Sequence, residues 1–167
     1  MSTHHTLLEP EESFVERVCH GEDVHWKLPP GNMRSNAQLW IHGELVRRQV
    51  RTVVLDLKRG AQNGLPAALE HAVCRSSLPI SSAPIRGLRT FFEALHKTNQ
   101  PLVVLIINVD ECYWCEFWNN LFSGLRGLVE AQRVSETRNI TIGSFGELDT
   151  ARFQRTIYGS CYHAAMI

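Results

Sequence analysis

Two short segments of the sequence carry residues whose types and spacing could do chemistry. The first is the loop 28–35, Leu-Pro-Pro-Gly-Asn-Met-Arg-Ser, which ends in Arg34 and Ser35. A basic side chain and a hydroxyl at the start of a helix can hold phosphate and magnesium. The second is the segment 108–115, Asn-Val-Asp-Glu-Cys-Tyr-Trp-Cys, which combines an acidic pair with a Cys-x-x-Cys. The sequence therefore offers two hypotheses, a nucleotide site and a redox site.

The second segment follows a run of apolar residues that predicts a buried strand. Residues 102–109 are almost all Val, Ile and Leu, which is typical of a strand buried on both faces in a parallel sheet. Apolar residues at three-and-four spacing then predict a helix over 114–130. Segment 108–115 is thus expected at the carboxyl end of a strand, where open α/β sheets bind their ligands.

The rest of the chain predicts alternating strands and helices. We predict strands at 24–28, 52–57 and 139–145 and a last strand from residue 156. Helices are predicted at 14–18, 35–49, 65–74, 85–95 and 148–154, and an interruption of regular structure at 60–64. This alternation favours a three-layer α/β domain with a mostly parallel sheet of about five strands and helices on both faces. Residues 1–10 are expected to form a flexible tail, and residues 11–167 a single domain.

The composition excludes several classes of function. The net charge of zero provides no strong field for nucleic acid or anionic membrane. No apolar run reaches the roughly 18 residues of a membrane span. Five unevenly spaced cysteines do not form a disulfide framework, and no second cysteine pair stands at zinc-site spacing, so we predict no metal site. We expect a cytoplasmic protein.

The loop 28–35 departs from the phosphate-binding P-loop in most positions. That motif is Gly-x-x-x-x-Gly-Lys-Ser/Thr, between a strand and a helix. Here Leu28 and Met33 occupy the two glycine positions, and Arg34 replaces the lysine. A side chain at Met33 is expected to obstruct the close approach of the backbone to a phosphate. Only the basic character of Arg34 and the hydroxyl of Ser35 remain.

The order of these segments resembles the ATPase core of AAA-type and STAND-type P-loop proteins. The resemblance rests on the loop 28–35, the helix after it, Val-Val-Leu-Asp-Leu at 53–57, Val-Val-Leu-Ile-Ile-Asn-Val-Asp-Glu at 103–111, Glu-Phe-Trp-Asn-Asn-Leu at 116–121 and Ile-Thr-Ile-Gly-Ser at 140–144. It implies a P-loop NTPase-like fold with ATP and magnesium as cofactors. By the same resemblance, the residues that would bind them are Gly31, Asn32, Arg34 and Ser35, with Ser144 at the polar sensor position.

The family's central strand ends in an acidic pair, an Asp for magnesium and a Glu that activates water. One alignment places this pair at Asp110 and Glu111. A second alignment, which fits the strand length better, places Ile107 and Asn108 there and removes both catalytic carboxylates. Magnesium-assisted hydrolysis needs the acids and the lysine together. The sequence therefore favours a degenerate P-loop protein without efficient hydrolysis, a regulatory or interaction module for an unidentified protein partner or a second copy. The alternative is a residual ATPase.

A dithiol oxidoreductase that uses Cys112 and Cys115 is the lesser alternative. A Cys-x-x-Cys at a strand-to-helix junction can present a reactive thiolate at a helix N-terminus. However, no proline follows Pro101, so the chain lacks the proline loop that faces such a dithiol. Asp110 and Glu111 would also raise the pKa of the first thiol.

Overall fold

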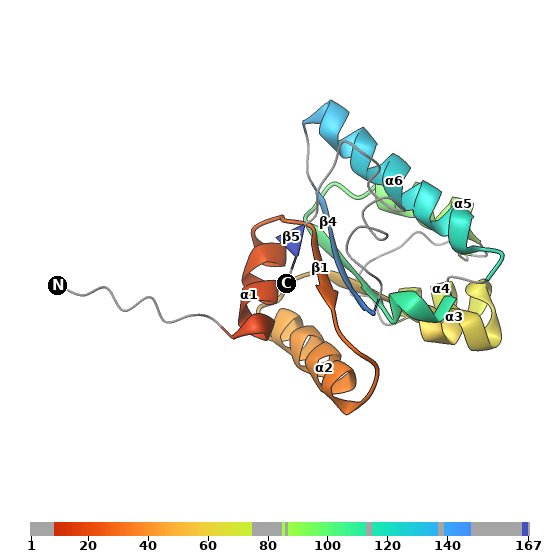
Figure 1. Ribbon diagram of the computed structural model, residues 1–167. Coiled ribbons are helices and arrows are strands. Elements are labelled where there is room, and N and C mark those ends of the chain that lie inside the picture. The colour runs from red at the N-terminus through yellow and green to blue at the C-terminus, as the bar shows by residue number, and fades with distance from the viewer. Residues whose placement is uncertain are drawn as a thin grey trace.

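The protein is built around a parallel β-sheet. The computed structural model describes residues 9–74, 85, 87–112, 115–136, 139–147 and 165–166 (Figure 1). The strands are β1 (Val24–Lys27), β2 (Thr52–Asp56), β3 (Leu102–Ile107), β4 (Ile140–Gly146) and β5 (Ala165–Met166), in the order β2-β3-β4-β1-β5, and every pairing is parallel. The prediction of about five strands is corrected to four strands of substantial length, because β5 is only a two-residue pairing beside β1.

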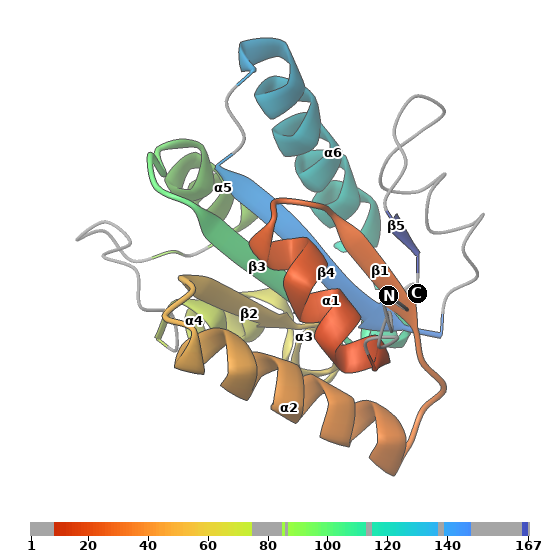
Figure 2. The same cartoon turned by 90° about the vertical axis from the view of Figure 1, so that its left-hand side faces the viewer.

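Helices cover both faces of this sheet. They are α1 (Pro10–Cys19), α2 (Asn32–Arg47), α3 (Leu57–Asn63), α4 (Leu65–Cys74), α5 (Leu88–His96) and α6 (Trp118–Ser135), with a 3₁₀ helix, η1 (Val109–Cys112), after β3. In Figure 2, α1 and α2 lie in front of the sheet and α5 and α6 behind it. The predicted α/β class is therefore confirmed.

The central strand β3 is buried on both faces, as its continuous apolar sequence predicts. Val103 and Leu105 pack into the core beneath α1 and α2. Val104 and Ile106 pack into the core on the opposite face, with α5 and α6. Successive side chains of a strand point to opposite faces, so a strand between two helical layers has no position for a solvated residue.

Several predicted boundaries are wrong. The predicted interruption of regular structure at 60–64 is wrong, because α3 runs through Gly60. This glycine is buried, and a Cβ added to it would lie 3.2 Å from the Phe117 ring. Asp56 starts that helix by accepting a hydrogen bond from the Lys58 N–H at 3.0 Å. Helix α2 begins at Asn32, three residues before the predicted start, α5 begins at Leu88 instead of 85, and α6 begins at Trp118 instead of 114. The helix at 148–154 and the start of the strand from 156 lie outside the described residues.

Helix α1 begins at Pro10, at the end of the predicted tail, and residues 1–8 are outside the described ranges. Phe14, Val15 and Val18 are buried on its inner side, as their spacing predicts. Among the described residues, no helix combines the length and the apolar character needed to cross a membrane.

Candidate functional site

The sheet order brings the two chemically interesting segments together. Strand β4 lies between β1 and β3, so the carboxyl ends of these three strands are neighbours. The loop after β1 contains Arg34 at its helical end, and the segment after β3 contains Asp110 in η1. Glu147 follows the end of β4. A parallel sheet thus places at one edge residues that are distant in the sequence.

Arg34 is buried, and its guanidinium binds the protein's own backbone and one carboxylate. Arg34 as a whole is only 3% exposed. Nη2 donates to the Leu28 carbonyl at 2.7 Å, and Nε lies 3.1 Å from the same oxygen and 3.2 Å from the Pro29 carbonyl. Nη1 forms an ion pair with Asp110, 3.1 Å from Oδ1. The planar fork of an arginine suits such a set of convergent acceptors better than a lysine would.

Asp110 extends this cluster to the end of β4. Its Oδ1 also accepts a hydrogen bond from the Glu147 backbone N–H at 2.9 Å. The Asp110 side chain is 21% exposed, so the ion pair lies just below the surface. We call this set, Arg34 with Asp110, the carbonyls of Leu28 and Pro29, and the N–H of Glu147, the Arg34–Asp110 clamp. The clamp fixes the loop after β1, the 3₁₀ helix after β3 and the end of β4 to one another.

The loop after β1 presents carbonyl groups to the interior where a phosphate cradle presents N–H groups. Pro29 and Pro30 have no backbone N–H, and the Leu28 N–H donates to the Gly146 carbonyl at 3.0 Å. Among the four residues 28–31, only Gly31 keeps an N–H that could serve a ligand. An anion cradle needs several converging N–H groups. The loop is therefore suited to hold a cationic group, and the guanidinium of Arg34 takes that place.

The other residues predicted for nucleotide binding lie around the clamp without joining it. Gly31, Asn32 and Ser35 are exposed at the start of α2, and Gly31 adopts φ 115°, a value that favours glycine. Met33 is 69% exposed, so its side chain points to solvent and does not fill the loop. Ser144 is completely buried, and its hydroxyl lies 2.9 Å from Nδ1 of His25, a residue that the sequence analysis did not select.

The end of β3 carries no carboxylate. Ile107 is the last residue of the strand and pairs with Asp56 of β2. Asn108 follows with φ 57° and donates from Nδ2 to Asp56 Oδ1 at 3.0 Å. Asp110 and Glu111 lie beyond it in η1. The strand β3 therefore ends at Ile107, and both carboxylates of this segment lie outside it.

A cavity of about 380 Å³ lies under the other flank of α2. It is lined by Ser35, Gln38, Leu39, His42, Val54, Asp56, Arg59, His71, Leu105 and Ile107. The resemblance implies a magnesium ion between a hydroxyl at position 35 and a carboxylate at the end of β3. Ile107 supplies no oxygen ligand there, and magnesium requires oxygen ligands. Asp56, which the sequence analysis did not select, is the carboxylate that lines this cavity.

The two cysteines do not lie at a helix N-terminus. Cys112 ends η1, and Cys115 lies three residues before α6, partly exposed. The first turn of α6 therefore does not adjoin Cys112, so the thioredoxin-like position of a dithiol at the start of a helix is not formed. Within the described ranges, no group of three or more His, Cys, Asp or Glu residues could hold a metal ion.

Comparison with known proteins supports the fold. No protein-family model matches the sequence, and no curated protein matches it. The chain is similar to the Aeropyrum pernix ORC2 protein in its ADPNP-ADP complexes, with a TM-score of 0.52, 11% identity, and coverage of 98% of this chain and 50% of that one. The ADP form of the same protein gives a TM-score of 0.49 at 14% identity, covering 98% and 50% of the two chains. The Aeropyrum pernix ORC1 protein in complex with DNA gives 0.46 at 11%, covering 96% and 45%.

The first of these similarities extends over 98% of this chain. The protein thus has a P-loop NTPase-like α/β fold. The chain spans about half the length of the solved structures that it resembles.

Proposed function

We propose that the protein is a degenerate P-loop NTPase-like module that acts by binding other proteins, with weak or absent nucleotide hydrolysis. The observation that carries this proposal is the position of Arg34. The residue that replaces the P-loop lysine is 3% exposed and is held by Leu28, Pro29 and Asp110. A side chain that must contact a phosphate cannot at the same time be bound to the carbonyl groups of its own loop and to Asp110.

A comparison of hydrogen-bond energies with the free energy of nucleotide binding supports a loop that stays closed around Arg34. A hydrogen bond to a charged group contributes about 1.5–3 kcal/mol, and Arg34 would have to give up several such bonds to reach a nucleotide. Binding with a millimolar Kd supplies only about 4 kcal/mol in total. Opening the clamp would therefore consume most of the free energy that weak nucleotide binding provides.

The residues at the end of β3 support the absence of efficient hydrolysis. Ile107 and Asn108 cannot act as a magnesium ligand and a general base in the way that an Asp and a Glu do. Asp110 is occupied by Arg34 and by the Glu147 N–H. Its carboxylate has a structural role that competes with any role in catalysis.

Nucleotide binding without hydrolysis is the second candidate. It is favoured by the similarity to the ORC2 protein, whose solved structure is of ADPNP-ADP complexes. On this alternative, ATP and magnesium would occupy the start of α2, where Gly31, Asn32 and Ser35 are exposed, and Arg34 would turn from Asp110 to the phosphates. The clamp would then have to open when the nucleotide binds.

Thermal unfolding with and without millimolar ATP and magnesium tests the proposal. A ligand that binds only the folded state raises Tm. We expect a change of less than about one degree in the wild type, with magnesium alone and ADP alone as ligand controls. A rise of several degrees that Arg34→Ala abolishes would contradict the proposal and establish a nucleotide site. The quantity to compare is the ligand-induced shift, because Arg34→Ala lowers Tm by itself.

A further inference from the structure

A groove lies between the first turn of α1 and the first half of α2. Its volume is about 700 Å³, within the range of about 300–1,000 Å³ for binding pockets. The residues that line it are Glu9, Glu11, Glu12, Met33, Asn36, Ala37 and Trp40. It lies at the surface, on the outer side of the helical layer that covers β1 and β4. The Arg34–Asp110 clamp lies on the inner side of α2.

The floor of the groove is apolar and partly exposed. Met33, Ala37 and Trp40 stand at i, i+4 and i+7 on α2, so they share one face of the helix. Ala37 is buried, whereas Met33 is 69% and Trp40 44% exposed. Large apolar side chains grouped at the surface are typical of a binding site. Tryptophan is also a residue type that dominates the energy of many interfaces.

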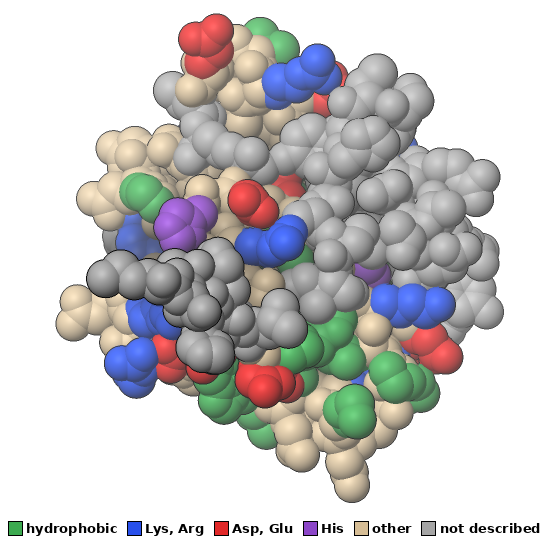
Figure 3. All heavy atoms as spheres, turned by 60° about the vertical axis from the view of Figure 1, so that its left-hand side comes forward, with side chains coloured by type: hydrophobic (Ala, Val, Ile, Leu, Met, Phe, Trp, Pro, Cys, Tyr) green, Lys and Arg blue, Asp and Glu red, His purple; other side chains and the backbone are tan. Residues whose placement is uncertain are grey.

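The rim of the groove is acidic on one side. Glu11 and Glu12 lie in the first turn of α1, where they also suit the helix dipole, and Glu9 precedes them. None of the three forms an ion pair with another described residue, whereas Glu16, Glu44 and Glu93 elsewhere on the surface pair with arginines. In a protein of zero net charge, three carboxylates that form no ion pair within the described residues produce a local negative potential. Figure 3 shows acidic side chains next to hydrophobic ones in the lower half of this face.

We propose that this groove binds a basic amphipathic peptide segment of a partner protein. Lysine or arginine side chains would pair with the three glutamates, while an apolar side chain would pack on Met33 and Trp40. A cation above the indole ring would add a cation–π contribution. The same charge disfavours phosphates, which separates this groove from any nucleotide site. The inference deepens the proposed interaction role and rests on it.

Binding of three dye-labelled synthetic peptides, measured by fluorescence anisotropy on the full chain, tests the inference. One peptide alternates Lys and Leu, the second Glu and Leu, and the third Lys and Ser. We expect the Lys-Leu peptide to bind at least about tenfold more tightly than the other two, and its affinity to fall as salt is added, because exposed charges are screened. Failure of the Lys-Leu peptide to bind, or equal binding of the Glu-Leu peptide, would overturn the inference.

Two variants locate the binding. Replacing Glu9, Glu11 and Glu12 together by Gln should weaken the Lys-Leu peptide about tenfold, and Trp40→Ala should weaken it by a similar factor. The matched control replaces by Gln three exposed glutamates elsewhere, Glu70 on α4, Glu116 just before α6 and Glu130 on α6, and should leave the affinity unchanged. In Figure 1, α4 and α6 lie on the side of the molecule away from α1.

Unchanged binding in the Glu9, Glu11 and Glu12 variant, with Tm within a few degrees of the wild type, would overturn the inference. The salt dependence of the wild type supplies a second test that needs no substitution. A failed peptide experiment would leave the proposal about Arg34 standing, because that proposal is judged by the nucleotide-induced shift in Tm.

Discussion

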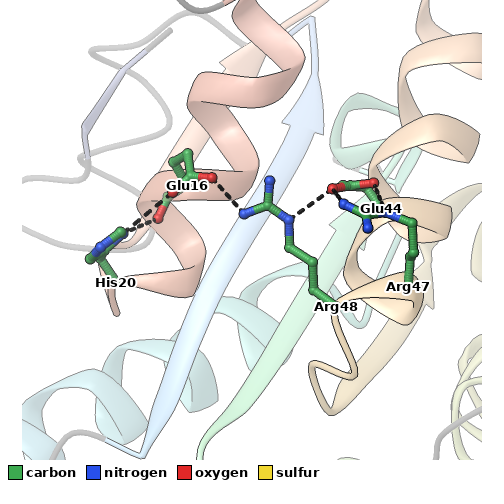
Figure 4. Close-up of polar contacts among 5 residues, drawn as sticks. All are labelled: Glu16, His20, Glu44, Arg47 and Arg48. Atoms are coloured by element: carbon green, nitrogen blue, oxygen red, sulfur yellow. Dashed lines mark hydrogen bonds and ion pairs between the residues drawn. The ribbon is translucent and has the colours of Figure 1, made fainter.

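Two clusters of charged side chains in this protein differ in the burial of their arginines. This difference determines how much each cluster is expected to contribute to stability. The Arg34–Asp110 clamp contains an arginine side chain that is 4% exposed. The second cluster joins the carboxyl-terminal halves of α1 and α2 through Glu16, His20, Glu44, Arg47 and Arg48 (Figure 4). There the Arg47 side chain is 71% and the Arg48 side chain 30% exposed.

The surface cluster has the shorter contacts, yet we expect it to contribute less to the free energy of unfolding. Arg47 Nη2 lies 2.6 Å from Glu44 Oε1, whereas Arg34 Nη1 lies 3.1 Å from Asp110 Oδ1. Exposed ion pairs contribute about 0–1 kcal/mol, but removing one partner of a buried pair costs about 3–5 kcal/mol. Burial therefore decides the contribution more than distance does. Loss of the Arg34–Asp110 clamp should therefore change the structure around the loop after β1. The contribution of the surface cluster to stability should instead depend on salt and pH.

The largest expected effect comes from Arg34→Ala. This substitution removes the guanidinium from Asp110 and from two loop carbonyls and leaves Asp110 only the Glu147 N–H, so we expect it to lower the free energy of unfolding by about 3 kcal/mol. The matched control is Arg89→Ala, which removes an arginine whose side chain is 91% exposed, and should cost less than about 0.5 kcal/mol. Equilibrium unfolding in urea measures both. If the two variants lose the same stability, the comparison between the clusters is wrong.

Gly146→Ala should have an intermediate effect by displacing the clamp from its other side. A Cβ there would lie 2.7 Å from Asp110 Oδ1 and 3.0 Å from the Val109 Cβ, so the carboxylate or the strand must move. Overpacking of this kind costs about 1–3 kcal/mol. Gly127→Ala is the control, because a Cβ at that helical position meets nothing within 4 Å. We expect urea unfolding to show that Gly127→Ala is neutral or stabilising. Equal stability of Gly146→Ala and the wild type would show that the clamp tolerates displacement.

The smallest effect is the pH dependence that arises from Glu44. Hydrogen bonds from Arg47 and Arg48 lower the pKa of Glu44 from 4.5 to about 2. A carboxyl whose pKa is lowered by folding stabilises the folded state above its unfolded pKa. That contribution should be complete above pH 4.5 and be lost as the pH falls to about 2.

Glu44→Gln should therefore flatten the dependence of stability on pH in this window, measured by urea unfolding at a series of pH values. Added salt should reduce the wild-type contribution as well, because the group is at the surface. Glu130→Gln, which replaces an exposed glutamate on α6, is the control. Parallel pH profiles for the wild type and Glu44→Gln would show that this cluster does not contribute.

The fold could be predicted largely from the sequence because its strands are continuous apolar runs. The predicted strands at 52–57, 102–109 and 139–145 correspond to β2, β3 and β4 within two residues at each end. Helix α3 was missed because glycine normally weakens a helix, whereas Gly60 lies within α3 in close contact with the Phe117 ring. The signal for α3 was Asp56, a residue type that caps helices, directly after a strand.

The candidate site was predicted only in part. Arg34 and Asp110 were both selected for their chemistry, but their ion pair joins residues 76 positions apart and depends on the order of β3, β4 and β1. Sequence spacing carries no information about such a pairing. Similarly, Ser144 was selected as a sensor, but its contact with His25 follows from the register between β1 and β4.

A double-mutant cycle on Arg34 and Asp110 tests the central claim most directly. Arg34→Ala, Asp110→Ala and the double variant are unfolded in urea, and the coupling energy is the difference between the double loss and the sum of the single losses. We predict a coupling of about 2 kcal/mol, unchanged by ATP and magnesium. A coupling near zero would contradict the account, because Arg34 would then be free to serve a ligand.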